Sequence, residues 1–215
     1  MFRDRREAGR TLATRLTFLA GRRDLLVLAL PRGGVPVAFE VARALRAPLD
    51  VFVVRKLGVP GQEELAMGAI ASGRVRVLNE EVIGSLNLPP EVIDRAAALE
   101  QRELARREEL YRGHRPPPEI EGRTILLIDD GIATGSTMLA AIRALRAQDA
   151  AAIVVGTPTI APSAIPAIRQ EADDIVAVLA PEEFRGVGMW YEDFTQTSDA
   201  EVNTLLEQAA PILSP

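Results

Sequence analysis

Two adjacent carboxylates stand near the middle of the chain, directly before a loop of small and hydroxyl-bearing residues. Asp129 and Asp130 follow the apolar run 125–128, and residues 131–137 read Gly-Ile-Ala-Thr-Gly-Ser-Thr. The apolar run predicts a buried strand, and the loop precedes a predicted helix. The first N–H groups of a helix lack partners and attract anions. This layout predicts a site for a phosphorylated sugar.

The loop and the two acids suit different parts of such a ligand. Gly135 allows close backbone approach, and the hydroxyls of Thr134 and Ser136 can donate hydrogen bonds to a phosphate. Hydrogen bonds to charged groups contribute about 1.5–3 kcal/mol each, so four or five would hold the phosphate firmly. Two carboxylates would repel a phosphate. We therefore expect Asp129 and Asp130 to face sugar hydroxyls or a Mg²⁺ ion that bridges hydroxyls and pyrophosphate.

Simpler explanations account for parts of this stretch. A strand end with a capped helix and two solvated acids explains the acid pair about equally well. The stretch lacks the Gly-Lys-Ser/Thr ending of a P-loop and the Gly-x-Gly-x-x-Gly pattern of dinucleotide-binding domains. The complete run 125–137 favours the sugar-phosphate site.

Two further segments place chemistry at predicted strand ends. Residues 31–34, Pro-Arg-Gly-Gly, allow an unusual backbone that can wrap an anion, although taken alone they more often form a plain turn before a helix. Arg55 and Lys56 end another apolar run, where two cations suit a pyrophosphate leaving group or simply form a solvated pair. Lys56 is the only lysine of the chain, which favours the functional interpretation.

A third segment, near the C-terminus, gathers aromatic residues in a chain that has few. Exposed rings can stack on a flat base, whereas a small satellite core is the alternative. The candidate base-binding residues are Phe184, Val187, Trp190 and Tyr191.

Composition excludes several classes of function. The 215 residues contain no cysteine and one histidine, which excludes disulfides, thiolate nucleophiles and histidine-cluster metal sites within the chain. The net charge of −5 argues against a nucleic-acid partner. No apolar run is long enough to span a bilayer, and residues 2–7 mix charges as no signal peptide does. We expect a soluble cytoplasmic protein with small-molecule partners and no membrane or nucleic-acid partner.

Apolar runs that alternate with helical patterns predict an α/β fold with a mainly parallel sheet covered by helices. Ligands of such sheets bind at the carboxyl ends of the strands, so the loops should converge on one crevice. We expect one domain over 1–215, with a core of about 24–180 and a hood formed by 181–197 plus the N-terminal segment. The predicted strands are 25–30, 49–54, 68–71, 75–78, 124–128, 151–155 and 174–179. The predicted helices are 4–20, 35–46, 89–112, 135–147, 162–171 and 199–209.

Residues 125–137 resemble the PRPP-binding signature of type I phosphoribosyltransferases, and the order of the other loops extends the resemblance over roughly 24–195. It implies a Rossmann-like type I fold with a small hood and a mobile loop. It also implies that Asp129 and Asp130 bind the ribose 2′- and 3′-hydroxyls and hold Mg²⁺ directly or through water. The implied phosphate cradle comprises Ala133, Thr134, Gly135, Ser136 and Thr137, and Gly131 is a further implied PRPP-binding residue.

The resemblance also implies which residues contact the pyrophosphate leaving group. Residues Arg32, Gly33 and Gly34 correspond to a pyrophosphate loop with an often cis peptide, which Arg32 and Gly33 would flank. Arg55 and Lys56 resemble the start of the mobile loop in orotate-type members, and here 57–66 would close as a lid.

The sequence also departs from the family pattern. Residues 57–88 contain no lysine, which the lid of orotate-type members carries. Ala133 stands where hypoxanthine-guanine members have an acid, and their 6-oxo-reading lysine is absent. The acceptor therefore stays open.

These observations predict a Mg²⁺-dependent glycosyltransferase, a pentosyltransferase of nucleotide and nucleoside metabolism, that uses PRPP and forms a homodimer. Its catalytic residues would be Asp129, Asp130, Lys56 and Arg32. One alternative is a non-enzymatic regulator that senses PRPP or a nucleotide on the same fold. A second is a phosphatase-like or nucleotide-binding domain unrelated to PRPP. We expect His114 at the surface and the charged helix 89–112 to be solvated or in a dimer contact.

Overall fold

The computed structural model of the chain describes residues 1–113 and 115–209. Its centre is a five-stranded sheet in the order β2-β1-β6-β7-β8, with every neighbouring pair parallel. All residues of β1 and β6 are buried, as their unbroken apolar runs predict. The predicted parallel sheet is thereby confirmed. The strands are β1 (Leu25–Ala29), β2 (Leu49–Val51), β6 (Thr124–Ile128), β7 (Ala152–Thr159) and β8 (Asp174–Leu179).

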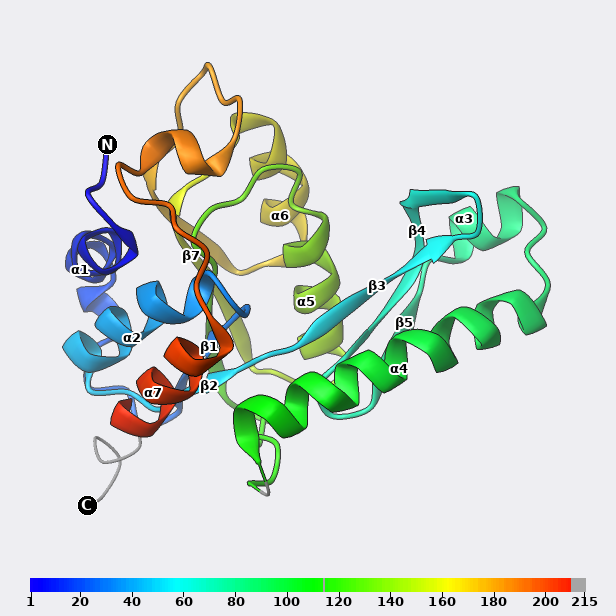
Figure 1. The fold of residues 1–215 in the computed structure, drawn as a ribbon, viewed down its shortest axis with the longest axis horizontal. Coiled ribbons are helices and arrows are strands. Elements are labelled where there is room, and N and C mark those ends of the chain that lie inside the picture. Colours follow the sequence, from blue (N-terminus) through cyan, green and yellow to red (C-terminus); the bar gives the residue numbers. More distant parts are fainter. Residues whose placement is uncertain (114, 210–215) are drawn as a thin grey trace.

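Helices cover both faces of this sheet, and alternate strand residues enter different cores (Figure 1). Val27 and Leu126 pack with α1 (Arg5–Arg15), α2 (Gly34–Leu45) and α7 (Asp199–Ala209) on one face. Leu26 and Leu127 pack with α5 (Ser136–Arg146) and α6 (Ile165–Glu171) on the other. This alternation follows from the two-residue period of a strand.

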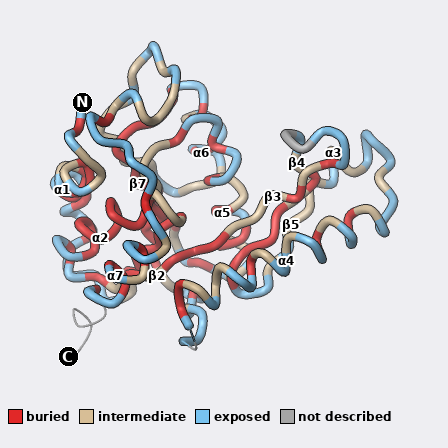
Figure 2. Tube along the Cα trace, viewed as in Figure 1, coloured by how far each residue is buried: buried red, intermediate tan, exposed pale blue. Residues whose placement is uncertain are grey.

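A second sheet forms an arm that projects from the core (Figure 1). It is antiparallel in the order β3-β4-β5, with β3 (Val54–Val59), β4 (Gln62–Ala71) and β5 (Val75–Leu78). The helices α3 (Glu80–Ser85) and α4 (Pro90–Arg112) follow it, and α4 runs along the arm. Figure 2 shows buried positions recurring on the side of α4 that faces these strands, which include Ile93, Ala97 and Leu104.

The arm corrects the expected elements in this region. The strand expected at 49–54 is two strands, and residues 54–71 form a hairpin that turns at Pro60 and Gly61. The expected lid, 57–66, is therefore the tip of this hairpin. Its glycines and proline are typical of a loop, and the pairing of the two strands outweighs that local signal. The helix α3 was not expected.

The N-terminal segment meets the segment that precedes α7 beside the core. Phe2 pairs with Tyr191 in a parallel bridge, next to the short helix Val187–Trp190. On α1, Ala8 and Leu12 are fully buried, which confirms the apolar face expected there. The regular helix ends at Arg15 rather than near 20, and a short 3-10 turn, Thr17–Leu19, follows. The expected surface position of His114 lies outside the described residues.

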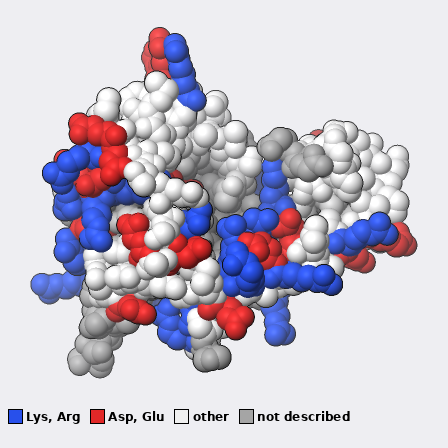
Figure 3. Space-filling view, in the orientation of Figure 1, with Lys and Arg blue, Asp and Glu red and all other residues white. Residues whose placement is uncertain are grey.

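The charged helix α4 carries its charges in pairs. Glu103 accepts hydrogen bonds from both Arg106 and Arg107, in i,i+3 and i,i+4 relations. In Figure 3, basic and acidic side chains are mixed along α4 and over α1, so this face of the molecule carries no continuous basic stripe. Within the described ranges, no helix is long and apolar enough to cross a membrane.

Candidate active site

The two glycine-containing loops lie side by side because the strands that precede them are neighbours. Ala29 pairs with Ile128, and the Leu30 N–H donates to the Ile128 carbonyl at 2.9 Å. A Cβ on Gly33 would lie 2.1 Å from Oδ2 of Asp130, and one on Gly34 would lie 2.7 Å from the Ile128 carbonyl oxygen. Only glycine lets the two loops approach this closely.

The loop 31–34 contains the non-proline cis peptide that was expected, one bond earlier than predicted. It joins Pro31 to Arg32 rather than Arg32 to Gly33. Arg32 is about one-third exposed, and its Nη1 lies 3.8 Å from Oδ1 of Asp199, at the start of α7. The helix α2 begins at Gly34, so its N-terminus follows directly on this loop.

The loop 131–137 leads into α5, whose N-cap is Gly135 with φ +77°. Thr134, Ser136 and Thr137 are exposed, and the hydroxyls of Thr134 and Ser136 lie 3.1 Å apart. The Ser136 N–H donates to the Thr134 hydroxyl at 3.4 Å, a long contact that a stronger acceptor can displace. Exposed hydroxyls at the start of an eleven-residue helix form a cradle for an anion.

The two carboxylates differ in their surroundings. Oδ1 of Asp129 accepts from the Asp130 N–H at 2.9 Å. Burial raises the pKa of Asp129 well above its ordinary value, and the Asp130 charge raises it further. Oδ2 of Asp130 accepts from Nε of Arg5 at 2.7 Å, and both side chains are nearly buried. Asp130 is therefore tied to the N-terminal helix, which sequence reasoning missed.

The chemistry of these donors suits a substrate-borne Mg²⁺ ion. Within residues 1–113 and 115–209, no group of three or more His, Cys, Asp or Glu side chains could enclose a metal. Mg²⁺ keeps several waters and is usually bound through one or two carboxylates together with substrate phosphates. Asp129 and Asp130 supply that number of carboxylates beside the phosphate cradle.

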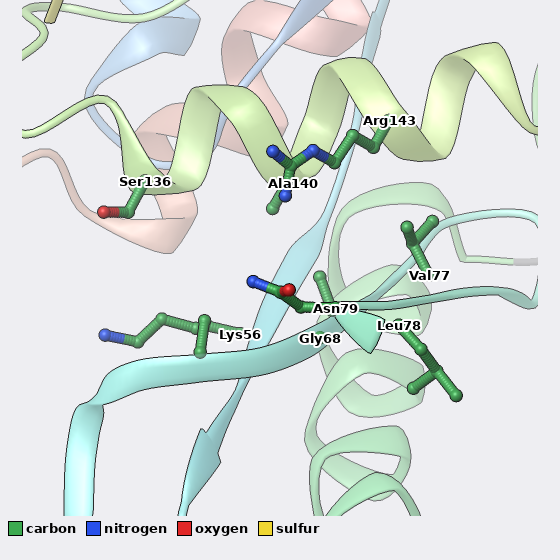
Figure 4. Close-up of a pocket in the computed structure, with 10 residues that line it drawn as sticks. Lys56, Gly68, Val77, Leu78, Asn79, Ser136, Ala140 and Arg143 are labelled. Atoms are coloured by element: carbon green, nitrogen blue, oxygen red, sulfur yellow. The ribbon is translucent and has the colours of Figure 1, made fainter. Parts of the chain in front are cut away.

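The two cations at the start of the arm lie in different environments. Nε of Arg55 donates to Oε2 of Glu100 on α4 at 2.6 Å. Lys56 instead lines a cavity of about 50 Å³ between the arm and α5, together with Asn79 and Ser136. Figure 4 shows the Lys56 amine and the Ser136 hydroxyl extending toward the same side. The structure thus brings Lys56, but not Arg55, to the phosphate cradle.

The hood, residues 181–197, contacts the loop that begins with Asp129 and Asp130, which is the carboxylate loop. Val187 packs on Gly131, where an added Cβ would meet its Cγ1 at 2.2 Å. Phe184 is half-buried, and Trp190 is partly buried, with an Nε1 that has no hydrogen-bond partner among the described residues. The exposed ring of this cluster belongs to Phe194, which is 37% exposed.

The expectation of an exposed Tyr191 ring is wrong. Tyr191 is 5% exposed because it packs on Phe2, with ring centroids 5.6 Å apart. Its hydroxyl donates to the Asp130 carbonyl at 2.5 Å, and burial together with the nearby Asp130 charge raises the pKa of Tyr191. Tyr191 supports the carboxylate loop from behind and has no face available to a base.

The fold defines the chain as a phosphoribosyl transferase domain of the type I architecture. A family model of the phosphoribosyl transferase domain matches residues 4–184, so the chain belongs to that family.

Two Mycobacterium tuberculosis proteins, named "Putative phosphoribosyl transferase Rv0571c" and "Putative phosphoribosyl transferase MT0597", are each 47% identical to it over 209 residues. The match covers 97% of this chain and 47% of each relative, so the chain spans about half the length of these curated relatives. The crystal structure of the protein TT1426 from Thermus thermophilus is also similar. It has 40% identity and a TM-score of 0.89, and the match covers 97% of this chain and 98% of that one.

Proposed function

We propose that the chain is a Mg²⁺-dependent phosphoribosyltransferase that transfers the ribose 5-phosphate of PRPP to a nitrogenous base or a similar nucleophile and releases pyrophosphate. The observation that carries this proposal is the contact between the glycines of loop 31–34 and the carboxylate pair. This contact supports a site in which an anion-binding loop lies against two carboxylates, and the loop that follows the carboxylates leads into α5. PRPP presents a pyrophosphate, a diol and a 5-phosphate in that same succession.

Each group of residues has a proposed task. Asp129 and Asp130 hold the ribose hydroxyls, while loop 133–137 holds the 5-phosphate through backbone N–H groups and hydroxyls. Arg32, Gly33 and Lys56 face the pyrophosphate. Arg55 contributes through its charge and through the ion pair that anchors β3 to α4.

The reaction exchanges one bond at C1 of the ribose. The bond from C1 to the pyrophosphate oxygen breaks, pyrophosphate keeps the electron pair, and a nitrogen of the acceptor forms the new bond and loses its proton to solvent. Positive charge grows on the ribose ring, and the nearby carboxylates stabilise it, while Arg32 and Lys56 stabilise the departing negative charge. A bound Mg²⁺ supplies further neutralisation of the pyrophosphate.

The acceptor side is proposed from the hood. Residues 181–197, together with the N-terminal segment, cover the carboxylate loop. Phe194 is 37% exposed, with Arg5 and Tyr191 packed on its ring, and Phe184, Val187 and Trp190 are half-buried in the same segment. Ala133 is exposed and carries no acid, so the acceptor must attack without a carboxylate base at that position.

The first test is binding of PRPP, measured by calorimetry in the presence of Mg²⁺. The wild type should bind, and the double variant Asp129→Asn plus Asp130→Asn should lose binding. Asp94→Asn is the matched control, because Asp94 lies on α4 in an exposed pair with Arg76. Equal affinity in the double variant and the wild type would contradict the proposal.

A PRPP-sensing regulator is the second candidate, and the missing acid at Ala133 favours it. Pyrophosphate release from PRPP, measured with a panel of purine and pyrimidine bases, separates the two. Release with one base supports the transferase. Tight binding without release from any base supports the sensor.

We further propose that the protein acts as a homodimer in cytoplasmic nucleotide and nucleoside metabolism. Leu99 is 67% exposed on α4, beside an open cleft of about 1050 Å³ between α4 and the hairpin. Light scattering of the purified chain and of Leu99→Glu tests the dimer. A wild-type chain that is monomeric at all concentrations would contradict it.

A further inference from the structure

The N-terminal segment is bound to the hood by main-chain hydrogen bonds. The Phe2 N–H donates to the Trp190 carbonyl at 2.8 Å, and the Glu192 N–H donates back to the Phe2 carbonyl at 2.8 Å. A third bond, of 2.9 Å, joins the Asp193 N–H to the Arg3 carbonyl. These bonds fix the start of α1 relative to the hood, next to the carboxylate loop.

Arg5 uses this position to contact three groups at once. Its Nε donates to Oδ2 of Asp130 at 2.7 Å, and its Nη1 donates to the Thr195 carbonyl at 2.8 Å. Its guanidinium carbon lies 4.0 Å from the centroid of the Phe194 ring. Arg5 is only 11% exposed and Asp130 only 14%. A planar guanidinium held on a ring and by two acceptors has little freedom to turn.

Asp130 is thereby held from several directions. Its carbonyl accepts from Tyr191, its carboxylate lies against Gly33, and Arg5 engages Oδ2. These contacts fix the plane of the carboxylate and so determine where Oδ1 points. A ribose hydroxyl that binds Asp130 would meet an acceptor already oriented, which removes an ordering cost from binding.

Neighbouring arginines of α1 lack this arrangement. Arg6 and Arg10 both lie 3.7 Å from Oε1 of Glu40 and are close to half exposed. Their guanidinium groups face α2 and not the crevice. The contact with Asp130 therefore belongs to Arg5 among these three residues.

We propose that Arg5 is a positioning residue for ribose recognition, which holds Asp130 so that its second oxygen receives a ribose hydroxyl, and that the N-terminal segment thereby links the hood to donor binding. This inference rests on the proposed function, because it assigns Asp130 to the ribose. It predicts that Arg5 acts on the sugar part of the ligand and not on the pyrophosphate part.

Fragment binding tests this division. Calorimetry with ribose 5-phosphate and, separately, with pyrophosphate plus Mg²⁺ should be done on the wild type, Arg5→Gln, Arg5→Lys and the control Arg6→Gln. Arg5→Gln should weaken the affinity for ribose 5-phosphate about 10- to 100-fold, which is the range of one charge-assisted contact. It should change the affinity for pyrophosphate by less than about twofold. Arg5→Lys should recover part of the loss, because it keeps the charge but not the planar fork. Arg6→Gln should change neither.

A double variant checks that Arg5 acts through Asp130. In an Asp130→Asn background, adding Arg5→Gln should weaken the affinity for ribose 5-phosphate by less than about twofold, because the carboxylate that Arg5 positions is gone. Thermal midpoints verify that each variant is folded. If Arg5→Gln fails to fold, Arg5→Lys is used for the test. It should weaken the affinity for ribose 5-phosphate several-fold and leave the affinity for pyrophosphate unchanged.

Two results would overturn the inference. One is an Arg5→Gln protein that binds ribose 5-phosphate as the wild type does. The other is an equal loss for both fragments, which would mean that Arg5 only supports the fold. Failure of the wild type to bind PRPP or either fragment would instead refute the proposed function, on which the inference depends.

Discussion

The loops at the ends of β1 and β6 and the arm of β3, β4 and β5 carry the two halves of the proposed donor site, yet they are built differently. The loops follow strands in which every residue is buried, and Gly33, Gly34 and Gly131 leave no room for a single added carbon. The arm holds Arg55, Lys56 and Gly58 at half-buried positions, and its β3–β4 register shifts on both sides of Gly58.

This difference indicates which part of the proposed site requires precisely placed side chains. In the proposed site, two half-buried carboxylates beside the close-packed core would bind the ribose, and small displacements there are costly. Arg55 and Lys56, two of the cations proposed for the leaving group, stand on a projecting hairpin instead. We therefore expect substitutions in the loops to have larger effects on the donor than substitutions in the arm.

The largest effect is expected for Gly33→Ala. Gly33 has φ −61° and tolerates alanine in its backbone, but the added Cβ would lie 2.1 Å from Oδ2 of Asp130. Overpacking of this kind costs about 1–3 kcal/mol, so PRPP affinity should fall by up to about 100-fold. Gly84→Ala on the arm is the control, because nothing lies within 4 Å of its added Cβ. Equal calorimetric affinities for both variants would remove the distinction between the two regions.

Asp129→Asn should separate binding from stability. PRPP affinity should drop about tenfold or more with the loss of a charged acceptor. Because burial raises the pKa of Asp129, its carboxyl is neutral in the folded state at low pH and becomes a buried charge as pH rises through that pKa. The wild type thus loses stability toward high pH through this group, and the variant does not.

Thermal midpoints measured across pH check this prediction. Asp129→Asn should raise the midpoint relative to the wild type at pH 8 and have less effect at pH 4. Asp94→Asn, which alters an exposed residue of the arm, should not reproduce the pattern. A variant that is less stable than the wild type at pH 8 would contradict the cause given for the raised pKa.

Within the arm, Lys56 and Arg55 should differ. Lys56→Gln should weaken the affinity for PRPP by about fivefold to tenfold, since Lys56 lines a cavity together with Ser136 of the phosphate cradle. Arg55→Gln should weaken it by less than about threefold and instead lower the free energy of unfolding by less than about 1 kcal/mol, because its partner is Glu100. Competition binding and denaturant unfolding of both variants measure the two effects, and a larger binding loss for Arg55→Gln would reverse the assignment.

The smallest effect on PRPP binding is expected for Tyr111→Phe, where the arm meets the core. The Tyr111 hydroxyl donates to Oδ1 of Asp199 at 2.7 Å, so its removal should cost about 1 kcal/mol of unfolding free energy. Burial, with the Asp199 contact, raises the pKa of Tyr111 to about 12 from 10.0. This stabilisation is complete below pH 10 and is lost as pH rises toward 12. The stability difference between variant and wild type should therefore shrink over that interval, and a constant difference would exclude a role for this ionisation.

Much of the core was predictable because its determinants are local. The apolar runs at β1 and β6 specify buried strands, β8 and α7 begin and end where their patterns indicate, and the run 125–137 carries its acids and its glycine at adjacent positions. Close packing of parallel strands then brings the loops 31–34 and 129–137 together almost automatically.

The arm and the hood were predicted less well, for different reasons. In the arm, Gly58, Pro60 and Gly61 are typical of a loop, and only the pairing with β4 shows that the residues before the turn form a strand. In the hood, the packing partners are distant in the chain. The aromatic pattern could not show that Phe2 buries the ring of Tyr191.

The sequence alone determined the parallel core, the acid pair and the anion loop, because neighbouring residues and short periods encode them. Only the tertiary structure decided that Arg5, 125 positions before Asp130, holds its carboxylate. It also decided that Arg55 pairs with Glu100 while Lys56 stays at the cradle. The physical reason is that an arginine-rich chain offers many equivalent charges, and packing alone selects which of them meets a given carboxylate.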